Sequence, residues 1–396
     1  MHTIARPTTL LQDLRLLPAQ YWILFSGTLV NRFGHFVIPF LAIYLKQRGQ
    51  DPRMIGLILG AYGAGGLIAG VVGGYLADKI GRKPTMLISC VGAAGAMLLL
   101  SQAESVTSLA ALTMLTGVAG AMYGPAAGAL IADLIPPHLR VRAYSCQRLA
   151  INLGFALGMA TAGFMAKKSF MLLFIADAAT TLILALTLFI GIKPRKIEMK
   201  SGSGWKPALA HMKANRPFKL AIVSSLLVGI VFWQMSSSYG LQVTEGAKLD
   251  ERTYGLLMAL NGIMITFIEL PLTSVTRRFD PGKVMTVGYI LVGLGMGLNG
   301  LGANAFFLIT SMIVFTTGEM ISLPVNNSYM ASLAPDEMRG RYQGVMSITW
   351  ASATMLGPPL GVALYEFSPG VLWIVIMGMS FAAAAMMFST RHKSGT

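Results

Sequence analysis

Between two long apolar runs, at about 54–77 and 84–102, stands the polar stretch Gly74-Tyr75-Leu76-Ala77-Asp78-Lys79-Ile80-Gly81-Arg82-Lys83. Each run is about as long as a helix must be to cross the hydrocarbon core of a bilayer, which takes about 20 residues. Gly81 permits a sharp turn between the two runs, because glycine tolerates backbone angles that other residues avoid. The stretch therefore predicts two membrane-spanning helices joined by a short basic loop.

Two further features of this stretch concern packing and charge. Gly74 continues a four-residue spacing with Gly66 and Gly70, and small residues at this spacing predict a tight helix crossing. Asp78 and Arg82 are placed to form a charge-assisted hydrogen bond at the end of the first helix.

The rest of the chain repeats the pattern of apolar runs and short loops. Of its 396 residues 54% are hydrophobic and 12% charged, and the mean hydropathy is +0.64. A soluble protein of this size cannot bury so much apolar surface, whereas helices that face lipid need not do so. We therefore predict an all-α membrane protein with twelve spans, at about 20–45, 54–77, 84–102, 106–134, 141–166, 169–192, 218–244, 252–276, 283–301, 304–333, 340–366 and 369–389.

The basic residues indicate the orientation. The net charge is +15, and most of the 31 lysines and arginines fall in the loops and tails that share one side of the membrane with both termini. Cytoplasmic loops carry such an excess, so we expect both termini in the cytoplasm and the chain in the cell membrane, the inner membrane where there are two. The basic stretch that runs from Lys193 to Lys219 is expected to be a cytoplasmic linker.

An internal repeat divides the chain. A shift of 199 residues places Pro125 on Pro324 and Arg140 on Arg339 without a gap. A shift by an even number of spans keeps the orientation, which indicates a parallel repeat about an axis normal to the membrane. We expect an N-terminal six-helix half at 1–192, a linker at 193–217 and a C-terminal six-helix half at 218–396.

The polar stretch resembles the signature loop of the major facilitator superfamily, G-x-L-a-D-R-x-G-R-K, with Lys79 in place of the usual arginine. The resemblance implies the fold of that superfamily, two six-helix bundles around a central solute pathway. It also implies a charge cluster that latches the two halves when the carrier faces outward, with the aspartate facing the start of the 340–366 segment. The gating residues implied are Gly74, Asp78, Gly81, Arg82, Lys83 and Asp133.

A second resemblance concerns the direction of transport. The 141–166 segment is similar to the glycine-proline motif of twelve-helix drug:proton antiporters, g-x-x-x-G-P-x-x-G-G, but Met159 replaces the proline and Ala162 replaces a glycine. Thr113 also stands where that branch carries an arginine. Simple close packing with a proline kink explains these residues equally well. The candidate packing residues are Gly154 and Gly158, and in the later repeat Gly357, Pro358 and Gly361.

Ionisable residues within the spans are costly and usually functional. Arg32 and His35 are one helical turn apart and are candidates for the pathway or a gate. Glu319 is the most central acid and is expected to face Arg32 and to carry a proton. Asp177 is a weaker candidate, with Arg148 as an equally good structural partner, and Glu269 allows either role.

Four neutral polar residues complete the candidate pathway. Gln234, Asn261, Asn326 and Asn327 lie within apolar segments, where an amide binds a solute or, more often, a neighbouring helix. We single out Gln234 and Asn326 for the pathway.

These features together predict a secondary transporter that works by alternating access, with proton-coupled efflux of small amphipathic compounds as the first hypothesis. The alternatives are an importer or exporter of a specific metabolite, and a non-transporting sensor on a carrier scaffold. We expect a monomer that contacts membrane lipid, with a small-molecule substrate, protons as coupling ion, no cofactor, no metal and no nucleic-acid partner. An enzyme is not expected, because the G-x-G-x-x-G match at 295–300 lies within an apolar span and follows no strand.

Overall fold

A computed structural model describes residues 14–193, 205–335 and 338–390, and this part of the chain is helical throughout apart from short connections. The predicted all-α fold is confirmed, and all twelve expected segments are helical. The helices of the first half are α2 (Ala19–Phe33), α3 (Val37–Gln47), α4 (Pro52–Lys79), α5 (Arg82–Gln102), α6 (Val106–Leu134), α7 (Pro137–Lys168) and α8 (Phe170–Gly191).

The second half repeats this order after a short helix, α9 (Trp205–Ala214), in the predicted linker. A helix was not expected there. It packs on the second half, where His211 Nδ1 lies 2.7 Å from the Tyr342 hydroxyl. The remaining elements are α10 (Arg216–Trp233), η1 (Gln234–Ser236), α11 (Ser238–Leu241), η2 (Gln242–Gly246), α12 (Glu251–Thr276), α13 (Pro281–Gly297), η3 (Leu298–Gly300), α14 (Ala305–Ser332), α15 (Arg339–Phe367) and α16 (Pro369–Phe388).

Eleven helical spans in the described residues are long and apolar enough to cross a membrane, counting α2 with α3 and α10 to η2 as one span each. The twelfth expected span, α15, is 29 residues long but less apolar. It begins with two arginines, and it packs against α4 of the other half as well as α10 and α16 of its own. A helix with so many protein neighbours needs less lipid-facing apolar surface.

Polar caps at the helix starts explain why the spans begin where they do. Asp51 accepts a hydrogen bond from the Arg53 amide (2.8 Å) at the start of α4, and Asp250 accepts one from the Thr253 amide (3.0 Å) at the start of α12. Such side chains satisfy amides that have no partner within the helix. Gly81, which precedes α5, has a φ of +106°, so the expected sharp turn is present.

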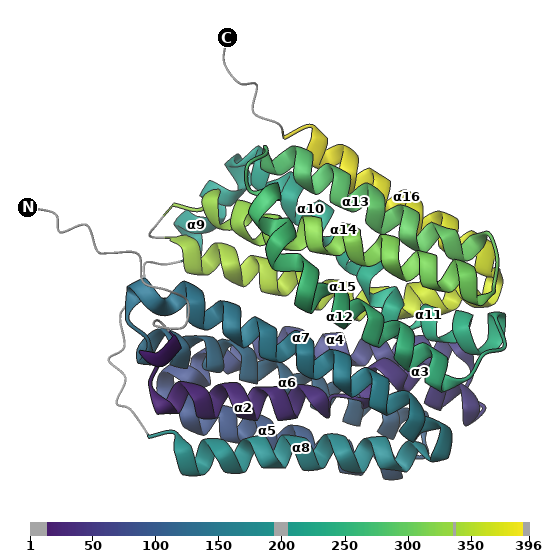
Figure 1. Cartoon of the computed structure of the whole chain (residues 1–396), viewed down its shortest axis with the longest axis horizontal. Coiled ribbons are helices and arrows are strands. Elements are labelled where there is room, and N and C mark those ends of the chain that lie inside the picture. The colour runs from purple at the N-terminus through teal and green to yellow at the C-terminus, as the bar shows by residue number, and fades with distance from the viewer. Residues whose placement is uncertain (1–13, 194–204, 336–337, 391–396) are drawn as a thin grey trace, which may run out of the picture.

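The two halves lie side by side, with α2 and α4–α8 on one side and α10 and α12–α16 on the other (Figure 1). The contacts between them are made mainly by α4 with α15, α7 with α12, and α3 with α11. We call the end of the molecule that bears Gly81 and α9 the motif end, and the end that bears α3 and α11 the opposite end. This arrangement places the first span of each half beside the interface.

The first span of each half is interrupted. α2 stops at Phe33 and α3 starts at Val37, while in the second half α10 passes into the 3-10 turn η1 and the short helix α11. Irregular backbone at membrane depth is tolerated where it is buried in protein or lines a cavity, because its amides and carbonyls then find partners. Both interruptions adjoin the polar residues that the sequence singles out.

Candidate functional site

The interruption of the first span is anchored by a carboxylate from another helix. Oδ2 of Asp177, on α8, accepts hydrogen bonds from the backbone amides of Phe36 (3.2 Å) and Val37 (3.3 Å). These are amides at the start of α3, which have no partner within the helix. Gly34 packs so closely on the Thr180 side chain that a Cβ there would clash with it. α8 therefore fixes the point at which the first span bends.

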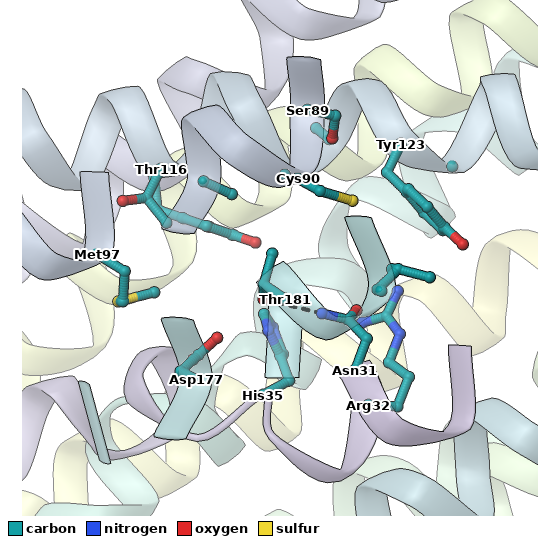
Figure 2. A pocket seen from close by; sticks show the side chains of 16 residues that line it. Asn31, Arg32, His35, Ser89, Cys90, Met97, Thr116, Tyr123, Asp177 and Thr181 are labelled. Atoms are coloured by element: carbon teal, nitrogen blue, oxygen red, sulfur yellow. Dashed lines mark hydrogen bonds between the residues drawn. The ribbon is translucent and has the colours of Figure 1, made fainter. Parts of the chain in front are cut away.

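A polar cavity of about 250 Å³ lies within the first half, next to this bend. Figure 2 shows residues of the bend and of α8 on one side of the cavity and residues of α5 and α6 on the other, and Asn31 donates a hydrogen bond to the Thr181 hydroxyl (2.9 Å). We call this the N-half cavity. The residues that Figure 2 labels are Asn31, Arg32, His35, Ser89, Cys90, Met97, Thr116, Tyr123, Asp177 and Thr181.

A larger cavity of about 400 Å³ lies between the two halves, and we call it the central cavity. Its walls combine four aromatic side chains with a few polar ones. Arg32 lines both this cavity and the N-half cavity. The lining residues are Arg32, Ile151, Asn152 and Phe155 from the first half, and Phe232, Trp233, Met235, Ser236, Met258, Asn261, Gly262, Ile265, Glu319 and Trp350 from the second.

Glu319, on α14, reaches the central cavity as the sequence predicts. Its Oε2 accepts a hydrogen bond from the Asn261 side-chain amide (2.8 Å), which also donates to the Thr316 hydroxyl (3.0 Å). Arg32 and Glu319 share the cavity, but in the described part of the chain no ion pair joins them. A fixed structural pair of these two residues is therefore absent from this conformation.

Glu269 is held by an arginine of the other half. Its carboxylate lies 2.7 Å from the Arg148 guanidinium, which joins α12 to α7. The glutamate side chain is only 7% exposed, whereas the arginine side chain is 44% exposed. Asp177, the other structural partner considered for Arg148, instead caps α3, and its helix α8 packs mainly on α5 and α2. Glu269 thus contributes an ion pair across the interface.

Gln234 lies beside the second helix interruption and is fully engaged there. Its side-chain amide nitrogen donates to the carbonyl oxygens of Ile230 (2.9 Å) and Gly357 (3.0 Å), and its oxygen accepts from the Ser238 hydroxyl (2.9 Å). Its side chain is buried, and it does not line the central cavity. In this conformation Gln234 supports the bend between α10 and α11 rather than a solute.

The other side-chain amides that the sequence singles out are asparagines, and only one of them lines the central cavity. Asn326 is buried and donates to the Ser225 hydroxyl (3.2 Å), which joins α14 to α10. Asn327 is exposed, and neither residue lines the central cavity. Asn261, which the sequence leaves as a general polar candidate, is the amide that meets Glu319.

The signature loop forms contacts at the motif end within the first half. Arg82 donates to the carbonyl oxygen of Ala77 (2.9 Å), and its Nε lies 3.5 Å from Oδ2 of Asp133 at the end of α6. Lys83 donates to the carbonyl oxygen of Phe189 (2.7 Å) near the end of α8. These contacts tie α4, α5, α6 and α8 together. The side chain of Asp78 and the surroundings of Gly74 lie outside the described part of the structure.

The predicted tight crossing at the glycine ladder of α4 is wrong for this conformation. A Cβ at Gly70 would meet nothing within 4 Å, and one at Gly66 would meet only Ala351, at 3.7 Å. The close approach occurs nearer the start of α4, where a Cβ at Gly60 would lie 2.7 Å from the carbonyl oxygen of Met355 on α15. α4 and α15 therefore converge toward the opposite end and separate toward the motif end.

The other glycine candidates are close-packing sites. A Cβ at Gly154 would lie 2.7 Å from the Leu29 carbonyl oxygen, and one at Gly158 would clash with the Phe33 backbone, so α7 and α2 pack backbone to backbone. In the second half Gly357 lies against Trp233, Gly361 lies against Gln234, and the Pro358–Pro359 backbone lies against Gly56. These contacts explain why small residues occupy the positions, without reference to the direction of transport.

Ion pairs join the two halves at the opposite end. Lys46, on α3, lies 3.6 Å from Glu245 and 3.9 Å from Glu366, and Lys167 lies 2.8 Å from Asp250. The Lys167 ammonium, which donates a hydrogen bond to Asp250, is the main reason that the pKa of this carboxyl is held at about 2. Together with the separation of α4 and α15 at Gly70, these pairs describe a molecule closed at the opposite end.

The aromatic lining of the central cavity is the main feature that sequence reasoning missed. Phe155, Trp233 and Trp350 come from three helices that are remote in sequence, and Phe232 adds a fourth ring. Aromatic side chains near the middle of spans that flank the predicted pathway were the available signal. The hydroxyl groups of the N-half cavity gave no signal, because serine and threonine are common at helix contacts in membranes.

In the described part of the chain, twelve helical segments form two similar halves, with a charged cavity between them and a basic signature loop at one end. This arrangement defines a multi-pass secondary transporter and not an enzyme. The sequence profile described as the Major Facilitator Superfamily matches residues 24–247 and 234–395. The chain belongs to the Major Facilitator Superfamily, and it is therefore a transporter of small molecules.

The chain is similar to several known transporters. The chain is 27% identical to a Na(+), Li(+), K(+)/H(+) antiporter of Planococcus maritimus, over 89% of this chain and 90% of that protein. It is 24% identical to the quinolone resistance protein NorA of Staphylococcus aureus, over 90% and 93%. Among solved structures it resembles a POT family transporter in complex with 5-aminolevulinic acid, with a TM-score of 0.79, 15% identity and coverage of 94% and 96%.

Proposed function

We propose that this transporter couples the export of small amphipathic compounds to the entry of protons, with Glu319 as the proton carrier. The observation that supports this most directly is the position of Glu319 in the central cavity, with the neutral Asn261 amide as its hydrogen-bond donor and no ion pair in the described residues. A carboxylate in a low-dielectric site is costly unless it binds a proton or a cation. A cationic group of a substrate and a proton would then compete for one site, which gives exchange.

The relatives support this choice over its alternatives. One is named as a cation/proton antiporter and another as a quinolone resistance protein, and both align over nearly the whole chain. A carrier for one specific metabolite, in either direction, is the second hypothesis, because the same fold serves many substrates. A non-transporting sensor is the third. The apolar and aromatic lining of the central cavity favours amphipathic compounds.

The orientation and the division into halves remain part of the proposal. We infer that the motif end faces the cytoplasm, with both termini and the 193–217 linker there, and that the halves 1–192 and 218–396 rock against each other about the central cavity. The termini at 1–13 and 391–396 lie outside the described residues. A phosphatase fused to the C-terminus should be inactive in whole cells, and an active fusion would overturn this topology.

The proton role is tested with Glu319→Gln in proteoliposomes. We expect loss of transport driven by a pH gradient, while substrate exchange at equal pH continues, because only the coupling proton has lost its site. Glu104→Gln, at an exposed loop, is the matched control and should behave as the wild type. A stable Glu319→Gln variant that a pH gradient still drives would refute the assignment, and Glu269 or Asp177 would be the next candidate.

The signature loop has a separate test. We infer that Asp78 helps to hold the state in which the motif end is closed, so Asp78→Asn should impair transport at normal levels of protein in the membrane. Wild-type transport by a well-expressed variant would remove the latch hypothesis.

A further inference from the structure

The central cavity is lined by two opposite charges, one from each half of the molecule. Arg32 is on α2 of the first half and Glu319 is on α14 of the second. Within the described residues, Arg32 has no ion-pair partner and no side-chain hydrogen bond, and Glu319 has only the hydrogen bond from Asn261. Both side chains are only partly buried, but charged side chains at membrane depth usually pair with an opposite charge or a polar group, because leaving them without one is costly.

Within the described residues, no carboxylate forms an ion pair with Arg32 in this conformation. Asp177 lines the N-half cavity with it, but Oδ2 of that carboxylate is engaged by the Phe36 and Val37 amides. Glu269 is already paired with Arg148. The planar guanidinium of arginine is suited to bind a carboxylate with two parallel hydrogen bonds. A carboxylate from a ligand is thus the natural complement of Arg32.

The space between the two charges is suited to an aromatic body. Phe155, Trp233 and Trp350 present rings to the central cavity, and its volume of about 400 Å³ is that of a site for a small organic molecule. At Arg32 this cavity adjoins the N-half cavity of about 250 Å³, whose hydroxyl groups can take polar substituents beside the carboxylate.

We propose that the central cavity preferentially binds aromatic zwitterions, with the carboxylate of the ligand on Arg32 and its ammonium group on Glu319. This inference rests on the proposed transport function and narrows its substrate class. A purely cationic ligand would leave the Arg32 guanidinium without a partner and would bring a like charge toward it. A zwitterion satisfies one charge of each half, and its binding therefore joins the two halves through the ligand.

The test compares three rigid probes that share one aromatic body. They are 4′-(aminomethyl)biphenyl-4-carboxylic acid, its methyl ester, which is only a cation, and its N-acetyl derivative, which is only an anion. Binding to the purified protein is measured by calorimetry at a single neutral pH, without a proton gradient. We expect the wild type to bind the zwitterion about tenfold or more tightly than either derivative, since each derivative loses one charge-assisted contact.

Variants assign the two charges. Arg32→Gln should weaken binding of the zwitterion and of the N-acetyl acid about tenfold, while the methyl ester binds as well as before or more tightly. Glu319→Gln should weaken binding of the zwitterion and the ester and spare the N-acetyl acid. Arg53→Gln, an exposed arginine at the start of α4, is the matched control and should leave all three affinities unchanged.

Arg32→Lys guards against a folding defect. It keeps a cation at the position, so it should retain the preference for the zwitterion over the ester at lower affinity, because lysine lacks the bidentate geometry. Equal wild-type affinity for zwitterion and ester, or an equal loss for all three probes in a folded Arg32→Gln variant, would overturn the proposal. Proton coupling is tested separately, by transport in a pH gradient. The coupling hypothesis can therefore be refuted while the preference for zwitterions is confirmed, and the preference can be refuted while coupling is confirmed.

Discussion

Removal of the Asp177 carboxylate should destabilise the bend in the first span. In Asp177→Ala the Val37 amide loses its acceptor, whereas the Phe36 amide keeps its hydrogen bond to the Gly34 carbonyl oxygen (2.9 Å); both are backbone donors at a buried position. A buried donor left without an acceptor costs about 1–3 kcal/mol, and here this applies to the Val37 amide alone. The bonds to Asp177 are 3.2 and 3.3 Å long, at the weak end of the usual range. We therefore expect a loss of about 1–3 kcal/mol.

Asp177→Asn should fall between Asp177→Ala and the wild type. Its carbonyl oxygen can still accept from the two amides, but the favourable interaction of a negative charge with the start of α3 is lost. That interaction and the excess strength of a charged acceptor amount to about 1–2 kcal/mol. The order of stability should therefore be wild type, then Asn, then Ala.

Thermal unfolding of the detergent-purified protein is the measurement, read as the order of midpoints because membrane proteins often unfold irreversibly. Asp51, which caps α4 at an exposed position, offers a matched pair of variants. Asp51→Ala should cost about 1 kcal/mol or less, since water replaces the lost acceptor there. An Asp177→Ala variant as stable as Asp177→Asn, or a loss no larger than that of Asp51→Ala, would refute the anchoring role.

Three further predictions concern the interface and the packing. Lys167→Gln should destabilise the contact between the halves at the opposite end by about 0.2–1 kcal/mol, as for an exposed ion pair. Because the pKa of Asp250 is held at about 2, the stabilisation by this pair is complete above the ordinary pKa of 3.8 and is lost only as the pH falls through about 2. Distances across this end, measured in spin-labelled protein, should therefore differ between Lys167→Gln and the wild type by the same amount at pH 5 and at pH 8. Gly158→Ala should lower the thermal midpoint through a clash with the α2 backbone that costs about 1–3 kcal/mol, whereas Gly95→Ala, which has open space, should not; equal midpoints would contradict this. Gly70→Leu should leave stability unchanged but slow counterflow, because we expect α4 and α15 to close there in the alternate state; normal counterflow would show that they do not.

Much of the fold could be predicted because the position and length of a membrane helix depend mainly on residues close together in the sequence. The apolar runs, the turn at Gly81 and the polar caps at Asp51 and Asp250 depend on neighbours within a few residues, so each was available before any contact was known. The less apolar character of α15 had a different origin, since that helix is covered by protein on more sides than its sequence alone reveals.

The candidate site was predictable only in part. Arg32 and Glu319 were expected to meet in one cavity, and they line it together. Gln234 was expected in the same pathway, but it supports a helix bend instead. The difference arises because the rotation of a helix about its axis decides which residues face a cavity, and a change of one position turns a side chain by about 100°.

The sequence by itself determined the membrane environment, the number and order of the spans, the basic loop and the set of buried charges, because each follows from hydropathy and from residues close in the chain. Only the tertiary structure decided how those charges are paired. Asp177 caps a helix start 140 residues away, Glu269 finds Arg148 across the interface, and Arg32 and Glu319 share a cavity with no ion pair in the described residues. Such pairings depend on the tilt, depth and rotation of helices that are remote in sequence, and local patterns carry no information about these quantities.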